Sequence, residues 1–227
     1  MTGHVRIELD GGTVLFTSRR GGVSEGPYAS LNLGPWTADD PAHVAANRER
    51  VRALAGGARL AQGHQVHGTR VVVDATGAED ADGQVTTDPE GAPIVLVADC
   101  LPIALVAPEA VGALHAGWRG LADGIVAQGV GALRRAGASR VAAAVGPGAR
   151  GCCYAVGDGL RTAFGTSGET LDLAAIAAGQ LAAAGVDEVH DTGLCTICAT
   201  DEDGPRFFSH RRDGGVTGRQ AGVVWRS

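Results

Sequence analysis

The residues best suited to chemistry gather in one stretch, ADCLPIALVAPEAVGALHAGWRG, at residues 98–120. Apolar residues dominate it, but Asp99 and Cys100 interrupt the run and His115 directly follows its second half. We interpret Cys100 and His115 as lying at strand ends, where a side chain reaches a cleft. Cysteine and histidine are soft metal ligands, and they are also the nucleophile and base of thiol enzymes. Both uses remain open at this point.

Two further histidines, His64 and His67, lie upstream in GHQVHG at residues 63–68. A histidine beside glycines is often only a polar turn residue. Two histidines and one cysteine, however, make a three-ligand set that suits Zn²⁺ and leaves a fourth position open. An open position indicates catalysis, because structural zinc sites use four protein ligands. The alternative for Cys100 is a buried, inert thiol.

The other cysteines give a weaker signal. CTIC, at residues 195–198, has the spacing of half a zinc site or of a redox pair. The sequence contains no second CxxC, and the adjacent Cys152 and Cys153 do not match the arm of a zinc knuckle. We therefore interpret these residues as packed thiols in turns.

Glycine- and arginine-rich segments indicate loops around a polar ligand. GPGARG, at residues 146–151, matches the GxGxxG pattern, but Pro147 and the missing βαβ unit argue against dinucleotide binding. Its backbone amides remain able to cradle an anion. TSRRGGVSEGPYASLNLG at residues 17–34 and FFSHRRDGGVTGRQAGVVW at residues 207–225 carry arginines that bind phosphate or carboxylate in a bidentate fashion.

The elements that must position these residues alternate irregularly. Alternating and apolar runs predict strands at Val5–Leu9, Thr13–Thr17, Thr69–Asp74, Pro93–Ala98, Ile103–Ala107, Val111–His115 and Val141–Val145, near Glu188 and Phe207, and at Gln220–Trp225. Helical periodicity and capping residues predict helices at Pro41–Ala55, Trp118–Ala136, Val156–Phe164 and Leu171–Ala184. The mixed order predicts a single α/β domain, residues 1–227, with mixed sheets layered with helices.

Composition excludes several classes of protein. The chain has 227 residues and a net charge of −6, and its 19 basic residues are all arginine. Because no basic block is present, nucleic acid is not expected as the partner. The start of the chain lacks a signal-peptide pattern, and the apolar runs are too short for a membrane span. Five cysteines argue against a disulfide framework. We expect a cytoplasmic monomer.

Taken together, these motifs resemble the YfiH family, also called the laccase-domain or multicopper polyphenol oxidase-like family. The resemblance runs in order through TSRRGGVSEGPYASLNLG, QVHG, ADCLPI, HAGWRG, GPGARGCCYAVG, CT and FFSHRRD…TGR. It implies an α/β fold of the cytotoxic necrotizing factor type. It also implies a mononuclear zinc site, with His67, Cys100 and His115 as the ligands.

Two positions depart from the family pattern. After SLNLG the family usually has a histidine shortly downstream, where this chain has Pro35 and Trp36. After CCY a glutamate is usual, and Ala155 stands there. Neither position touches the implied ligands, so we expect effects on the pocket wall or on substrate choice.

The activities implied by the resemblance are phosphorolysis of purine nucleosides and deamination of adenosine. Bound zinc with an open position would lower the pKa of a bound water to about 7 and would supply a hydroxide for attack on C6 of adenosine, with loss of ammonia. In phosphorolysis, phosphate attacks C1′ of the ribose. We expect Arg19, Asn32 and Arg212 to bind phosphate or substrate, with Arg212 also stabilising developing charge. Asp99 orients a ligand or accepts a proton.

Three alternatives remain. Cys100 and His115 resemble the Cys–His pair of cytotoxic necrotizing factor-type deamidases, although His67 favours a metal. A copper-dependent polyphenol oxidase needs several coppers and many histidines, and this chain has seven. Cu²⁺ would still compete with Zn²⁺ for the three ligands. A non-catalytic metal-binding protein is the third alternative.

Overall fold

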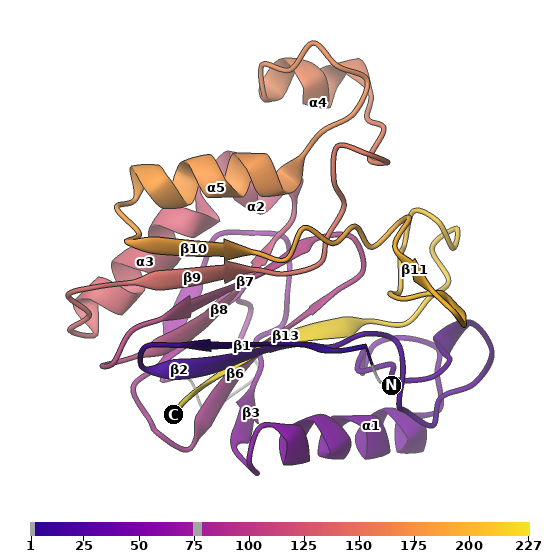
Figure 1. The fold of residues 1–227 in the computed structure, drawn as a ribbon, viewed down its shortest axis with the longest axis horizontal. Coiled ribbons are helices and arrows are strands. Elements are labelled where there is room, and N and C mark those ends of the chain that lie inside the picture. The colour runs from indigo at the N-terminus through magenta and orange to yellow at the C-terminus, as the bar shows by residue number, and fades with distance from the viewer. Residues whose placement is uncertain (1–2, 75–78) are drawn as a thin grey trace.

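Two β-sheets form the centre of the molecule, and helices cover their outer faces (Figure 1). The computed structural model describes residues 3–74 and 79–227. In spatial order, the five-stranded sheet consists of β1 (Val5–Leu9), β2 (Gly12–Phe16), β13 (Gln220–Arg226), β6 (Gly91–Val97) and β3 (Arg59–Ala61). The six-stranded sheet consists of β10 (Glu188–Asp191), β9 (Ala142–Val145), β7 (Leu101–Val106), β8 (Val111–Ala116), β5 (Gly83–Thr86) and β4 (Val71–Val73).

Five α-helices and a small hairpin complete the described chain. The helices are α1 (Pro41–Leu54), α2 (Trp118–Asp123), α3 (Ile125–Arg135), α4 (Asp158–Ala163) and α5 (Leu173–Ala183), with a 3₁₀ turn η1 (Gly26–Tyr28). The hairpin pairs β11 (Thr200–Asp201) with β12 (Gly204–Pro205). Helix α4 projects away from the layers on a long connection (Figure 1).

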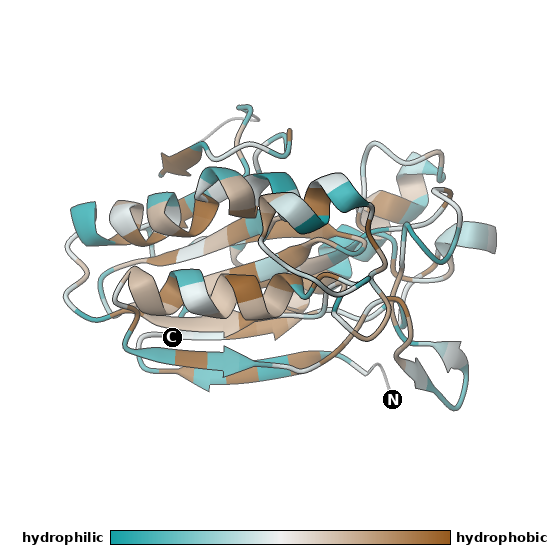
Figure 2. Ribbon diagram, turned by 90° about the horizontal axis from the view of Figure 1, so that it is seen from above, coloured by the Kyte–Doolittle hydropathy of each residue, from teal (hydrophilic) through white to brown (hydrophobic). Residues whose placement is uncertain are grey.

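Three hydrophobic cores hold four layers together. The core between the sheets joins residues of β2, β6 and β13 to residues of β7, β8 and β9: Val14, Phe16, Val95, Ala104, Val106, Val111, Ala113, Ala144 and Val224. A second core packs α2, α3 and α5 on the six-stranded sheet, and a third packs α1 on the five-stranded sheet. Strands covered on both faces need apolar residues throughout, and β6, β7 and β8 are buried along their whole length. The edge strand β1 instead alternates apolar and polar residues (Figure 2).

The predicted mixed α/β architecture is confirmed. Parallel pairs (β3 with β6, β4 with β5, β9 with β10) occur beside antiparallel ones in the same sheets. The predicted helix at Pro41 begins there, because the Asp40 side chain accepts a hydrogen bond from the N–H of Ala42. Among the described residues, no helix has the length and apolarity that crossing a membrane requires.

Two predicted elements differ in the structure. The helix expected at Trp118–Ala136 breaks at Gly124, whose φ of 90° is left-handed, so that α2 and α3 are separate. The short strand expected near Phe207 lies just upstream, as β12 (Gly204–Pro205), and Phe207 and Phe208 themselves are buried outside any strand. Strands β3 and β5 were not predicted, because at three and four residues they are too short to show a strand pattern.

Candidate metal centre and its pocket

The structure brings His67, Cys100 and His115 together. One ligand atom from each lies within 4.8 Å of the others. The register of the sheet explains two of them: Pro102 pairs with His115 and Leu101 with Ala116, so Cys100, just before β7, meets the end of β8. His67 comes from the loop between β3 and β4, where its φ of 62° is left-handed.

Gly117 lies beside the donor atoms and, having no side chain, leaves room there. A β-carbon at residue 117 would lie 2.9 Å from the Cys100 Sγ and 3.4 Å from the His67 Cδ2. Any larger residue would crowd the Cys100 sulfur and the His67 ring. One sulfur and two imidazole donors around such a space fit a zinc ion with a fourth position open.

Asp82 holds two of these residues, and sequence reasoning missed it. This buried carboxylate lies with its Oδ1 2.7 Å from the Nδ1 of His115. It also accepts hydrogen bonds from the backbone N–H groups of Val66, His67 and Gly68. Because Nδ1 is engaged by Asp82, the His115 Nε2 is the nitrogen left for Cys100 or for a metal. No sequence signal separates Asp82 from its acidic neighbours Glu79 and Asp80.

The three donors are electrostatically coupled. Burial alone would raise the pKa of the Cys100 thiol, but the charge and hydrogen bonds of His115 and His67 lower it to about 6. Burial alone would lower the pKa of His115, but Cys100 and Asp82 raise it to about 9. Without a metal, these opposed pKa shifts favour a thiolate beside an imidazolium. The thiolate is the form that binds metals, and it is also the form that attacks electrophiles.

Asp99 lies at the same pocket with both carboxylate oxygens engaged. Its Oδ1 accepts from the Thr196 hydroxyl and its Oδ2 from the Arg211 backbone N–H, each at 2.7 Å. Its φ is 91°, an unfavourable value for a residue with a side chain. Asp99 thus fastens the loops of residues 196 and 211 to the strand end that carries Cys100.

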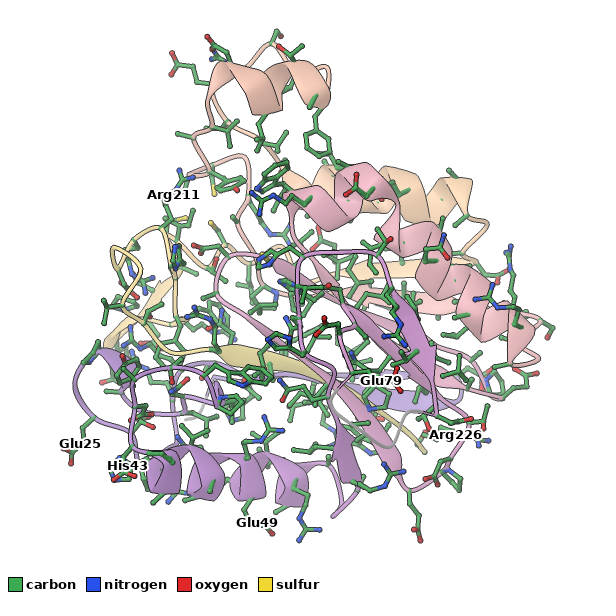
Figure 3. The ribbon with its side chains drawn as sticks, turned by 180° about the vertical axis from the view of Figure 1, so that it is seen from behind. Glu25, His43, Glu49, Glu79, Arg211 and Arg226 are labelled. Atoms are coloured by element: carbon green, nitrogen blue, oxygen red, sulfur yellow. The ribbon has the colours of Figure 1, made fainter. Side chains whose placement is uncertain are left out.

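The donor set opens into a pocket of about 520 Å³, a volume typical of small-molecule sites. Aromatic and apolar walls come from Trp36, Leu96, Val97, Trp118 and Tyr154, and polar groups from His64, Gln65, Arg119, His210, Arg211 and Arg219. Arg211 stacks over the Tyr154 ring at 5.0 Å and donates to the Ala155 carbonyl at 2.6 Å. Figure 3 shows Arg211 beneath the segment that carries α4.

The expected binding residues Arg19, Asn32 and Arg212 do not line this pocket. Arg212 donates to the carbonyls of Thr196 and Phe207 and pairs with Asp213, which uses up its guanidinium. Arg19 donates to a loop carbonyl and lies over the Phe208 ring. Both arginines thus contact other groups of the protein, and their expected role in binding phosphate stays a prediction.

Asn32 is fully buried and acts one step behind the pocket wall. Its Oδ1 accepts from the backbone N–H groups of Gly34 and Arg219. Its Nδ2 donates to the Thr37 hydroxyl at 2.8 Å. Gly34, Thr37 and Arg219 all line the pocket, so Asn32 positions residues that can touch a ligand.

Of the two departures from the family pattern, Trp36 lines the pocket and Ala155 follows the lining residue Tyr154. Trp36 is 62% exposed and packs edge-on against His64, with ring centroids 5.1 Å apart. The His64 Nδ1 faces Asp80 at 2.8 Å, so the first histidine of GHQVHG belongs to the rim. The Ala155 carbonyl accepts from Arg211, an arrangement that needs no side chain at residue 155.

Residues 13–227 match the model of the family described as multi-copper polyphenol oxidoreductase laccase. The chain belongs to this family. A Streptomyces griseus relative is 42% identical, with 92% of each chain covered, and a Corynebacterium glutamicum relative is 39% identical, with 93% of each covered. Both are named purine nucleoside phosphorylase.

Solved structures of the family agree with the fold. A Neisseria meningitidis protein superposes with a TM-score of 0.85 at 33% identity, covering 99% of both chains. The Bacillus licheniformis protein YfiH superposes with a TM-score of 0.86 at 30% identity, covering 95% of this chain and 93% of that one. The resemblance to the YfiH family is thereby confirmed.

Proposed function

We propose that this protein is a purine nucleoside phosphorylase that also deaminates adenosine, and that His67, Cys100 and His115 bind one zinc ion. The observation that carries the proposal is the pocket, which combines this donor set with aromatic walls and three arginines. The names of the relatives, which cover nearly the whole chain, support it.

The pocket offers the contacts that a nucleoside and phosphate need. Trp118, Trp36 and Tyr154 provide flat apolar surfaces on which a purine ring stacks. The guanidinium groups of Arg119, Arg211 and Arg219 supply charge for a phosphate dianion. Bound zinc would supply Lewis acidity in the pocket, which His67, Cys100 and His115 help to line.

The chain's own residues position the two reactants. A phosphate oxygen held by the arginines attacks C1′ of the ribose, and the C1′–N9 bond breaks. The electron pair of that bond goes to the purine, which takes up a proton as it leaves. Asp82 and Asp99 act on the site through His115 and the neighbouring loops, because their oxygens already accept hydrogen bonds.

Turnover of inosine, guanosine and adenosine, measured with and without phosphate, tests the proposal. We expect free base and ribose 1-phosphate only when phosphate is present. With adenosine alone, inosine and ammonia should form slowly. Release of base at equal rates without phosphate would show a hydrolase instead, and no turnover of any nucleoside would contradict the enzyme assignment.

One observation favours a second candidate. The thiolate–imidazolium pair of Cys100 and His115 is the resting state of a cysteine nucleophile and its base. A metal-free hydrolase would keep its activity in a strong chelator. The phosphorylase proposed above would lose its activity there and recover it when zinc is returned.

A further inference from the structure

A second cluster of metal-ligating atoms lies outside the pocket. The sulfur atoms of Cys152, Cys153, Cys195 and Cys198 all lie within 4.8 Å of one another. Those of Cys152 and Cys198 are 3.6 Å apart. Around a tetrahedral zinc, with Zn–S bonds of about 2.3 Å, neighbouring sulfurs lie about 3.8 Å apart. The cluster therefore has nearly the dimensions of a four-thiolate metal site before any metal is considered.

The two halves of the cluster come from different loops. Cys152 and Cys153 lie in the turn after β9, where the Cys153 N–H donates to the Arg150 carbonyl at 3.0 Å. Cys195 and Cys198 follow β10, and Cys195 forms a parallel bridge with Gly148. This bridge brings the CTIC turn against the adjacent pair, an arrangement that the interpretation as packed thiols in turns did not include.

Backbone hydrogen bonds tie the CTIC turn to the other loop. The Thr196 N–H donates to the Gly148 carbonyl at 3.1 Å, and the Gly148 N–H donates to the Leu194 carbonyl at 3.3 Å. Burial in a core does not explain the cluster, since Cys152 and Cys198 are both exposed.

We propose that Cys152, Cys153, Cys195 and Cys198 bind a structural zinc ion, distinct from the site at Cys100. Four protein ligands close the coordination shell, so this ion would hold loops together and would not meet substrate. Binding would release the thiol protons and would join the two loops without a disulfide.

The loops that this ion would join form one side of the pocket. Tyr154, next to Cys153, lines the pocket directly. Thr196, next to Cys195, donates its hydroxyl to Asp99, and its carbonyl accepts from Arg212. A zinc ion at the four cysteines would thus fix Tyr154 and Asp99 relative to the strands that carry Cys100 and His115.

Metal counting on protein purified under reducing conditions tests the proposal. Native mass spectrometry should find about two zinc ions per chain in the unmutated protein. Cys198→Ser and the matched control Cys100→Ser should each lose about one ion, from different sites. X-ray absorption of zinc-loaded Cys100→Ser should show a shell of sulfur alone. The metal count and the sulfur shell do not depend on nucleoside turnover. The four-cysteine site can therefore be absent while the proposed function stands, and it can be present if the proposed function fails.

Three results would overturn the proposal. One is an unchanged zinc content in Cys198→Ser. Another is a disulfide between Cys152 and Cys198 in peptides mapped from the reduced preparation. The third is rapid alkylation of all four thiols in Cys100→Ser that carries no metal. If Cys198→Ser fails to fold, the sulfur shell and the metal count of Cys100→Ser decide between these outcomes.

Discussion

The Oδ1 of Asp82 lies 2.7 Å from the Nδ1 of His115, while the same carboxylate binds three consecutive backbone N–H groups around His67. One buried acid thus orients a histidine on β8 and fixes the loop that supplies the other histidine. The third donor, Cys100, is aligned by the pairing of β7 with β8. The geometry of the candidate metal centre depends on Asp82 as much as on the donors themselves.

Replacing Asp82 with asparagine should weaken zinc binding about 10- to 100-fold, because the charge that supports His115 is lost. Competition with a chromophoric chelator measures this affinity. Asp80→Asn is the matched control, since Asp80 pairs with the rim residue His64. Equal affinities for the two variants would show that Asp82 serves only the loop.

The two uses of Cys100 can be separated by chemistry. As a zinc ligand, Cys100 should be shielded from iodoacetamide, and Cys100→Ser and His115→Ala should both lose the zinc of this site. Chelation should abolish nucleoside turnover, and added zinc should restore it. Activity that persists in metal-free protein and is destroyed by alkylation of Cys100 would favour the Cys100–His115 dyad.

The metal-free protein should show an unusual pH dependence at Cys100. The thiolate is the reactive form, and the pKa of this thiol is lowered from 9.0 to about 6. Its alkylation rate should therefore rise with pH through about 6 and be nearly level by neutral pH. Peptide mass spectrometry after timed alkylation measures the rate at this residue. A midpoint near 9 would show that the His115 charge does not act on the thiol.

The arginines should divide into two groups. Arg219→Met should raise the KM for phosphate about tenfold or more, since a charged hydrogen bond contributes about 1.5–3 kcal/mol. Arg212→Met should instead lower the melting temperature and reduce phosphorolysis and deamination alike, because it leaves the carbonyls of Thr196 and Phe207 without their donor. A selective phosphate defect in Arg212→Met would return that residue to the binding site.

Gly117→Ala should lower zinc affinity, because the added β-carbon would lie 2.9 Å from the Cys100 Sγ. Gly179→Ala is the control: it lies in α5 with nothing within 4 Å of the added carbon. That control should stabilise the protein by about 0.5–1 kcal/mol and leave zinc binding unchanged. Calorimetric unfolding and zinc titration measure the two effects. Unchanged zinc affinity in Gly117→Ala would mean that the donors move apart easily.

Local pattern was sufficient for most of the architecture. Strands β6, β7 and β8 are buried on both faces, so each appears in the sequence as a continuous apolar run. The capping residue Asp40 indicated the start of α1. Cys100 and His115 were identifiable because a polar residue at the end of such a run must face a cleft. Strands β3 and β5 were missed because they have only three and four residues, too few to form such a run.

Tertiary contacts decided the rest. Asp82 looks like any surface acid until β5 is placed beside β8, where its carboxylate meets His115. In the sequence, Arg212 and Arg219 are indistinguishable as loop arginines. In the structure, Arg212 donates its hydrogen bonds to backbone carbonyls outside the pocket lining, whereas Arg219 lines the pocket. The sequence determined which residues could bind metal or anion; long-range strand and loop pairing determined which of them meet, because their partners are far away along the chain.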